Sequence, residues 1–248
     1  MSALDWLIAR PVAHRGLHDA AAGIVENTPS AFAAAVAAGY AIECDLQISA
    51  DGEAMVHHDD TVDRLTDGHG RLDAMTAADL KRVPYRATSD RMITLGELCD
   101  LVADRAVLVI ELKSHFDGNL RLVTRAAVVL TAYRGRAALM SFDPAPMAAL
   151  REIAPALPRG IVAESHYRHH EWDHLSRRTK RALAYFAHAL RTRPQFIAYS
   201  VKDLPALAPL TARRFLGIPL LTWTVRTPED QACATRFADQ MIFEGFRP

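Results

Sequence analysis

Cysteine is scarce in this sequence: Cys44, Cys99 and Cys233 are the three in 248 residues, and none lies in a CxxC pair. Thiols so few and dispersed argue against a disulfide framework or a cysteine-based zinc site and suit a reducing compartment. Uninterrupted apolar runs of roughly 18 residues are also missing, so we expect no membrane span. The N-terminus lacks a basic segment followed by an apolar core, so we expect no signal peptide and a cytoplasmic protein.

An excess of one charge is missing as well. The 29 basic and 29 acidic residues give a net charge of zero, so the composition indicates no nucleic-acid partner. Apolar residues are abundant, at 50% of the chain, which is enough for one sizeable core. We therefore expect a single domain over residues 1–248, a length that suits an α/β barrel. The composition leaves the oligomeric state open.

Short β-rich segments alternate along the chain with amphipathic segments rich in alanine and leucine. The expected strands are 11–13, 40–47, 53–57, 106–112, 137–142, 160–163, 196–199, 220–225 and 240–243. The expected helices include 29–38, which begins after Thr28 as N-cap and ends at Gly39, and 95–103, 120–131, 146–153, 178–190 and 228–237. This alternation predicts parallel βαβ units.

The strand count favours one α/β architecture over another. Residues 50–52 are typical of a hairpin turn, so the segment 53–57 is expected to return antiparallel to 40–47. Eight strands then remain, which fits a closed TIM (β/α)8 barrel with a small β-hairpin insertion after the second strand. The alternative, a doubly wound open sheet, usually carries a G-x-G-x-x-G loop after its first strand, and this chain has none there.

Charged side chains gather where three of these strands end. Glu43 and Asp45 are two residues apart near the end of the second strand, so their side chains point to one face. Glu111 and Lys113 have the same spacing at the end of the next parallel strand. Three carboxylates at the carboxyl ends of barrel strands predict a site for a hard divalent cation, Mg²⁺, Ca²⁺ or Mn²⁺, rather than zinc.

The hairpin brings a histidine to the same place. If the turn is centred near Asp51, residues whose numbers sum to about 102 lie opposite each other, which is ordinary antiparallel pairing. His58 then lies across from Cys44, within reach of Glu43 and Asp45. By the same alternation His57 faces away and is expected to be structural, and Cys44 is expected to be a small buried residue.

Together these groups suit the hydrolysis of a phosphodiester. The phosphoryl charge can be neutralised by a metal, Arg15 and Lys113. Histidine is the side chain best suited to proton transfer near neutral pH, so His14, at the end of the first strand, and His58 can exchange protons with the nucleophile and the leaving group. Asp59 is expected to orient a neighbour or cap a loop rather than bind the metal, whereas Arg64 fits either the phosphate or a loop ion pair.

Several stretches resemble the glycerophosphodiester phosphodiesterase family and its phospholipase-like relatives. They are 13–16 (AHRG), 26–28 (ENT), 42–47 (IECDLQ), 51–52 (DG) and 56–66 (VHHDDTVDRLT), with weaker matches at 94–98, 110–113, 141–142 and 223–225. The resemblance implies a TIM barrel that hydrolyses glycerophosphodiesters to sn-glycerol 3-phosphate and an alcohol. It further implies metal binding by Glu43, Asp45 and Glu111, acid–base catalysis by His14 and His58, phosphate binding by Arg15 and Lys113, and a glycerol-side contact by Trp223.

Two positions depart from the family pattern. The family often has asparagine after Trp-Thr-Val, where this chain has Arg226, and it often has Thr-Asp where this chain has Phe243 and Glu244. Both lie at strand ends and bear on specificity for the alcohol. A lysophospholipase D-like phosphodiesterase and a non-catalytic phosphoester-binding barrel remain the alternatives. The basic segment 166–193 fits a solvated helix face, with a lipid-attracting lid as its alternative.

Overall fold

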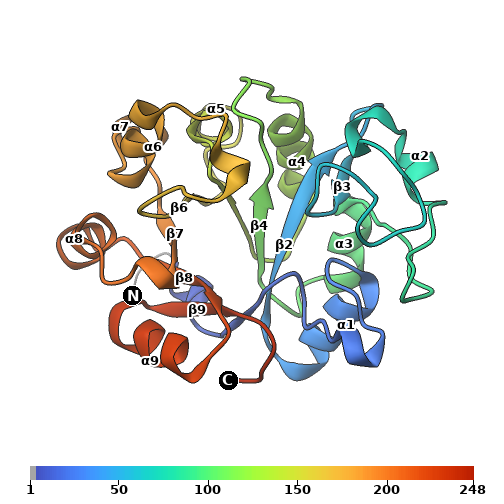
Figure 1. The fold of residues 1–248 in the computed structure, drawn as a ribbon, viewed down its shortest axis with the longest axis horizontal. Helices are drawn as coiled ribbons and strands as arrows, with labels where there is room; N and C mark the ends of the chain where they lie inside the picture. The colour runs from blue at the N-terminus through green and yellow to red at the C-terminus, as the bar shows by residue number, and fades with distance from the viewer. Residues whose placement is uncertain (1–3) are drawn as a thin grey trace.

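The computed structural model describes residues 4–248 and folds them into a closed barrel of parallel strands surrounded by helices (Figure 1). The strands are β1 (Val12–Ala13), β2 (Ala41–Ile48), β3 (Ala54–Val56), β4 (Leu108–Leu112), β5 (Ala137–Ser141), β6 (Arg159–Ala163), β7 (Phe196–Ser200), β8 (Leu220–Val225) and β9 (Gln240–Phe243). Their order is β1-β9-β8-β7-β6-β5-β4-β2-β3, and β1 also pairs with β2. That pairing closes eight strands into the predicted TIM barrel and leaves β3 as the hairpin strand.

Helices cover the outside of the barrel. They are α1 (Pro29–Ala38), α2 (Ala77–Leu80), α3 (Leu95–Val102), α4 (Arg121–Ala132), α5 (Pro144–Ile153), α6 (Arg177–Ala184), α7 (Ala189–Thr192), α8 (Leu207–Leu216) and α9 (Pro228–Phe237). In the described part of the chain, none of them has the length and apolar character that crossing a membrane requires.

The two faces of strand β2 carry different kinds of side chains. Ile42, Cys44 and Leu46 point outward into the apolar layer between the strands and the helices. Residues of the opposite parity point inward, because side chains alternate along a strand. Ala41 joins the apolar filling of the lumen, whereas Glu43 and Asp45 lie further along the strand. The lumen is therefore apolar below and acidic toward the carboxyl ends of the strands.

The hairpin has the register that residue numbers predict. Leu46 pairs with Val56 and Ile48 with Ala54, so opposing numbers sum to 102. The chain leaves β3 with a hydrogen bond from the His57 amide to the Asp45 carbonyl at 3.0 Å. His58 is thus delivered to the level of the inward-facing carboxylates, as expected.

One predicted helix is corrected by the structure. The expected helix 178–190 is two helices, α6 and α7, because Phe186 adopts a left-handed backbone (φ 55°) between them and packs on the core. Helices α2 and α8 lie outside the predicted set; Pro209 falls in the first turn of α8, where proline is tolerated.

Thr28 precedes α1, but its side chain does not cap the helix. The hydroxyl donates instead to the carbonyl of Val25 at 2.8 Å, and the Asp90 carboxylate accepts from the amide of Ser30 at 3.1 Å. A tertiary contact therefore replaces the local cap that the sequence predicts.

Candidate active site

The turn after β1 presents His14 and Arg15 at the mouth of the barrel. The His14 amide donates to the Phe243 carbonyl of β9 at 2.9 Å, and the Gly16 amide donates to the Glu43 carbonyl at 3.1 Å. Gly16 has φ 80°, and a Cβ there would lie 2.8 Å from Ala31 Cβ in α1. The His-Arg-Gly sequence therefore needs its glycine both for the left-handed turn and for the close approach of α1.

Three buried carboxylates lie beside this turn. Glu43 and Asp45 come from β2 and Glu111 from β4, where Asp45 and Glu111 are direct neighbours in the strand register. The residues are 2%, 1% and 8% exposed, and one oxygen from each lies within 4.8 Å of the others. The i, i+2 spacing of Glu43 and Asp45 in β2 thus places both carboxylates on the same face of the strand, as predicted.

Lys113 and Arg15 neutralise part of this negative charge. Lys113 Nζ lies 2.8 Å from Asp45 Oδ1 and 2.6 Å from Glu111 Oε1, and Arg15 Nε lies 3.3 Å from Asp45 Oδ2. Burial opposes ionisation of Asp45, but Lys113 and other nearby cationic groups outweigh it and hold the pKa of Asp45 well below its usual range. Burial lowers the pKa of Lys113, but Asp45 and Glu111 outweigh this effect, so its pKa is raised and the ammonium stays charged.

Glu43 and Glu111 show the opposite behaviour. Burial and the charges of Asp45 and Glu111 raise the pKa of Glu43 well above its usual value. The pKa of Glu111 is also raised, by burial and Asp45, with Lys113 opposing the shift. Two cations face three carboxylates, so a negative charge is left over. An all-oxygen set with uncompensated charge fits a hard divalent cation such as Mg²⁺, Ca²⁺ or Mn²⁺.

His58 approaches the carboxylates from the hairpin side. Its Nδ1 lies 2.7 Å from Asp59 Oδ1, and Arg64 Nε donates to the other oxygen of Asp59 at 2.5 Å. Asp59 is therefore placed to orient the imidazole through Nδ1, and within residues 4–248 no hydrogen bond forms at Nε2. Arg64 lies in a loop ion-pair network, since it also donates to Glu26 at 2.6 Å.

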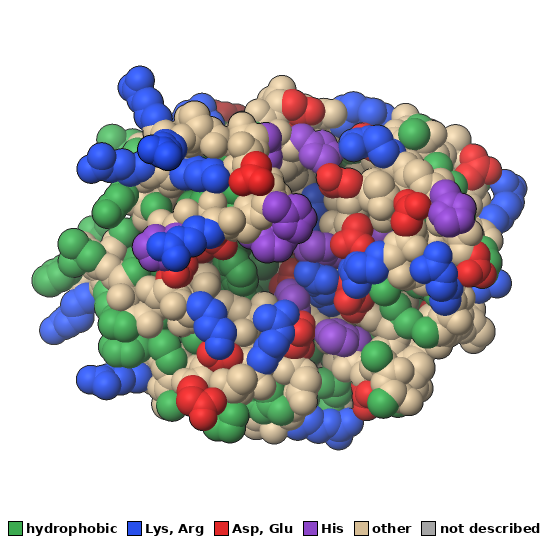
Figure 2. Space-filling model, viewed as in Figure 1, with side chains coloured by type: hydrophobic (Ala, Val, Ile, Leu, Met, Phe, Trp, Pro, Cys, Tyr) green, Lys and Arg blue, Asp and Glu red, His purple; other side chains and the backbone are tan. Residues whose placement is uncertain are grey.

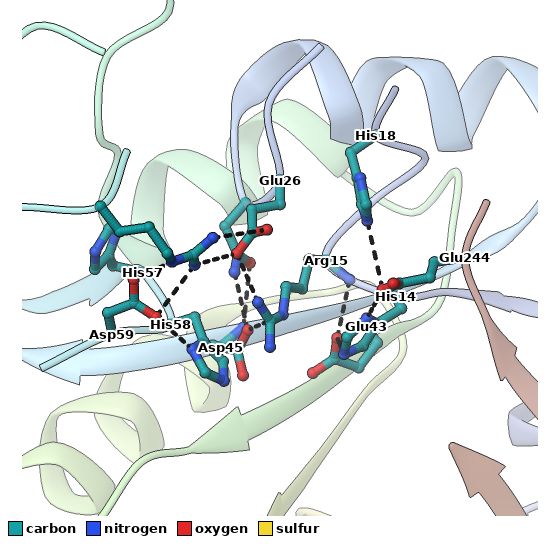
Figure 3. A network of polar contacts seen from close by, with 12 residues as sticks. His14, Arg15, His18, Glu26, Glu43, Asp45, His57, His58, Asp59 and Glu244 are labelled. Atoms are coloured by element: carbon teal, nitrogen blue, oxygen red, sulfur yellow. Dashed lines mark hydrogen bonds and ion pairs between the residues drawn. The ribbon is translucent and has the colours of Figure 1, made fainter. Parts of the chain in front are cut away.

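His14 approaches from the other side. Figure 3 shows His58 and Asp59 on one side of the Asp45 carboxylate and His14 with Glu244 on the other. His14 Nδ1 lies 2.5 Å from Glu244 Oε2, while its Nε2 lies 3.9 Å from Glu43 Oε2. Burial lowers the pKa of His14, although the Glu244 carboxylate opposes this effect. Each histidine thus has a carboxylate at Nδ1 and leaves Nε2 for other chemistry.

Polar side chains from the loop before α1 support the site. Asn27 donates from Nδ2 to Asp45 Oδ2 at 2.9 Å and accepts from the Asp45 amide at 3.3 Å. Arg15 Nη1 donates to Glu26 Oε1 at 2.6 Å. Burial opposes ionisation of Glu26, but Arg64 and Arg15 outweigh it and lower its pKa to about 2. Glu26 and Asn27 therefore hold Arg15 and Asp45 in place, respectively.

A cavity of about 560 Å³ adjoins the carboxylates. Figure 2 shows a hollow near the centre of this face, surrounded by acidic, basic and histidine side chains. The residues that line the cavity include His58, Glu111, Lys113, Phe142, His170 and Trp172. Trp223 of β8 is half-buried and meets Phe142 edge-to-face, with ring centroids 5.5 Å apart. Its predicted contact with substrate therefore stays a prediction.

The structure brings most of the predicted residues to one place: His14, Arg15, Glu43, Asp45, His58, Glu111 and Lys113. His57 faces away, with Nε2 3.2 Å from the Thr61 carbonyl, and Cys44 is buried, as expected. Sequence reasoning did not foresee that Glu244 would hold His14. The signals in the sequence were that Glu244 follows the last strand and that it lies where the chain departs from the family pattern.

A family model for the glycerophosphoryl diester phosphodiesterase family matches residues 14–243. The chain belongs to this family. A glycerophosphodiester phosphodiesterase of Caldanaerobacter subterraneus is 30% identical over 161 residues, which cover 61% of this chain and 65% of that protein. A Mycobacterium tuberculosis protein named probable glycerophosphodiester phosphodiesterase 1 is 31% identical over 178 residues, covering 62% and 64%. The matches thus span somewhat less than two thirds of these family members.

Solved structures support the fold. An Oleispira antarctica phosphodiesterase in complex with the product sn-glycerol-3-phosphate superposes with a TM-score of 0.77 at 18% identity. The superposition covers 94% of this chain and 91% of that one. At this identity the likeness establishes the shared barrel alone.

Proposed function

We propose that this protein hydrolyses glycerophosphodiesters to sn-glycerol 3-phosphate and an alcohol. The observation that carries the proposal is the pair of imidazoles on opposite sides of the buried carboxylates, each with Nδ1 held by a carboxylate. A displacement at phosphorus needs one group to take a proton and another to give one, and His14 and His58 supply both. Membership of the family and the cavity beside Lys113 support the same conclusion.

Glu43, Asp45 and Glu111 would hold the divalent cation, Mg²⁺, Ca²⁺ or Mn²⁺. When bound, such a cation neutralises charge on the phosphoryl oxygens and favours attack at phosphorus. Arg15 and Lys113 carry full positive charge in this site, because neighbouring carboxylates raise the pKa of both groups against the effect of burial. They bind the phosphate and orient it between the two histidines. Trp223 is the proposed contact for the glycerol side.

The histidines perform the proton transfers. The carboxylates of Glu244 and Asp59 retain a proton on Nδ1 of His14 and His58, so that Nε2 is the reacting nitrogen in each. One Nε2 accepts the proton of the attacking hydroxyl, and the other, protonated, gives its proton to the leaving alkoxide. Burial lowers the pKa of His14 and so favours its neutral form, which suits the accepting role.

The test is a panel of glycerophosphodiesters with choline, ethanolamine or glycerol as the alcohol, each with Mg²⁺, Ca²⁺ or Mn²⁺. We expect metal-dependent release of sn-glycerol 3-phosphate, measured with a coupled dehydrogenase. His14→Ala and His58→Ala should each lower kcat by at least about 100-fold, the lower end for acid–base catalysis. His69→Ala is the matched control, because His69 is exposed and pairs with Asp63.

Other outcomes would contradict the proposal. Full activity in His14→Ala would remove that residue from the mechanism. Preferred turnover of lysophosphatidylcholine would favour the lysophospholipase D-like alternative, and phosphoester binding without turnover would favour the non-catalytic barrel.

A further inference from the structure

A second group of metal-ligand side chains lies beside the carboxylates but does not include them. His14 follows β1, His18 lies four residues further along the same loop, and Glu244 follows β9. One ligand atom from each lies within 4.8 Å of the others. Figure 3 shows the three side chains pointing toward one another at the end of the site away from His58.

The arrangement leaves a nitrogen without a hydrogen bond. His18 Nε2 is shielded from solvent and, among the residues the structure describes, has no hydrogen-bond partner. Its nearest carboxylate oxygen is Glu244 Oε2, at 3.7 Å, which is too long for a hydrogen bond. The same oxygen is 2.5 Å from His14 Nδ1. Two imidazole nitrogens therefore converge on one carboxylate oxygen.

Arg226 fixes the carboxylate in this orientation. Its Nε donates to Glu244 Oε1 at 2.5 Å, so Oε1 is occupied and Oε2 is turned toward the histidines. Burial opposes ionisation of Glu244, but the hydrogen bond from His14 and other cationic neighbours outweigh it and hold its pKa far below its usual range. A charged carboxylate, held by an outer partner and facing two imidazoles, is a common arrangement around a bound transition metal.

We propose that His14, His18 and Glu244 form a second cation site that binds Zn²⁺, and that Zn²⁺ bound there inactivates His14. Donors about 2.0–2.2 Å from a tetrahedral zinc ion lie roughly 3.4 Å apart. His14 Nδ1 and His18 Nε2 lie 2.5 and 3.7 Å from Glu244 Oε2, on either side of that value, so the three donors are already close to the spacing that zinc requires.

The chemistry of the donors separates this site from the first one. Two imidazole nitrogens and a carboxylate suit Zn²⁺, whereas the three carboxylates of Glu43, Asp45 and Glu111 suit a hard ion such as Mg²⁺. The two sites share no ligand, although His14 lies between them, with Nε2 3.9 Å from Glu43. Excess Mg²⁺ should therefore fill the first site without displacing Zn²⁺ from the second.

The consequence for His14 follows from its two ring nitrogens. A zinc ion takes the lone pair of Nδ1, so a neutral imidazole must carry its proton on Nε2. Nε2 then has no lone pair with which to accept a proton, and it holds its own proton too firmly to act as an acid. Inactivation is therefore expected whichever role His14 has. This part of the inference rests on the proposed function, whereas zinc binding does not.

The first experiment measures binding alone. Purified protein in excess Mg²⁺ is titrated with Zn²⁺ by isothermal titration calorimetry, for the wild type, His18→Ala, and His169→Ala/His170→Ala. The last variant removes two histidines near the cavity that are not part of the proposed site. We expect His18→Ala to weaken zinc binding by at least about tenfold, since losing a ligand should cost no less than losing an outer partner. The His169/His170 variant should bind like the wild type.

The second experiment measures activity with the same proteins. Zn²⁺ should inhibit the Mg²⁺-loaded wild type, while His18→Ala should keep its basal activity and need at least about tenfold more Zn²⁺ for half inhibition. His18→Gln, which preserves a polar side chain, should behave like the alanine variant and guards against a folding defect. Relief by extra Mg²⁺ with no effect of His18→Ala would place zinc at the carboxylates and overturn the proposal, as would dependence on His169 and His170. If no phosphodiester is hydrolysed, the calorimetry still decides zinc binding, so the two failures are distinguishable.

Discussion

Glu43→Gln should make the metal-free protein more stable and the metal-loaded protein less stable than the wild type. Glu43 is almost fully buried, and burial together with Asp45 and Glu111 raises its pKa well above the ordinary value of 4.5. At neutral pH the native state therefore carries a charge, or a bound proton, at a cost. Glutamine keeps the shape and can still accept the hydrogen bond from the Arg15 amide, now 2.9 Å long.

The size of the effect can be set from the same observations. A single stabilising substitution commonly adds about 0.5–2 kcal/mol to the free energy of unfolding. For a chain of this length, 1 kcal/mol raises Tm by about 2–4 °C, so the metal-free variant should melt about 1–8 °C higher. Saturating Mg²⁺ at roughly 100 times Kd should add about 2.7 kcal/mol to the wild type. The variant lacks one ligand and should gain far less.

The assay is thermal unfolding followed by circular dichroism, with EDTA and then with Mg²⁺ or Ca²⁺. Wild type and variant should exchange their order of stability between the two conditions. The pH dependence of the stability difference has a definite sign. Because the pKa of Glu43 is raised in the native state, the wild-type protein loses stability as pH rises above the unfolded-state pKa of this carboxyl. The gain from glutamine should therefore vanish below about pH 4.5. A metal-free variant that is less stable than wild type at pH 7.5 would refute the reasoning.

Three further predictions rest on other parts of the molecule. Glu26→Gln should lower the free energy of unfolding by about 1 kcal/mol at neutral pH. Arg64 and Arg15 lower the pKa of Glu26 from 4.5 to about 2, so urea titrations should show this difference shrinking as pH falls through that range. A difference that does not depend on pH would argue against the ion pairs. Gly160→Ala should destabilise the barrel by about 1–3 kcal/mol, because a Cβ there would lie 2.4 Å from the Phe196 ring. Gly96→Ala in α3 is the control: its Cβ would lie 3.8 Å from Thr94 Oγ1, an ordinary contact, so it should be neutral or stabilising, and equal denaturation midpoints for the two variants would contradict this. Asp59→Asn should lower kcat by about tenfold or more with little change in KM, since His58 Nδ1 loses its charged acceptor, and unchanged steady-state kinetics would show that Asp59 does not position the base.

The hairpin shows how far local rules reach. Side-chain parity and a turn near Asp51 are enough to pair Leu46 with Val56 and to send His58, but not His57, toward the carboxylates. The same parity puts Glu43 and Asp45 on the inner face and Cys44 on the outer one. These results follow from the two-residue repeat of a strand, which sequence alone reveals.

Other contacts depend on segments that meet only when the chain folds. The helix after Thr28 begins where its pattern predicts, yet a carboxylate from Asp90, sixty residues on, binds the Ser30 amide. The break at Phe186 divides an expected helix because that side chain packs on the core, a gain that helix propensity does not include.

By itself the sequence indicated the alternating strands and helices, the cluster of carboxylates at the strand ends and the two histidines, because strand periodicity and residue type specify them within short segments. Only the tertiary structure decided what holds those histidines and how the charges compensate. Glu244 meets His14 across 230 residues, and this contact exists because β9 pairs with β1 when the barrel closes. Closure is a property of all eight strands together, so no local pattern contains it.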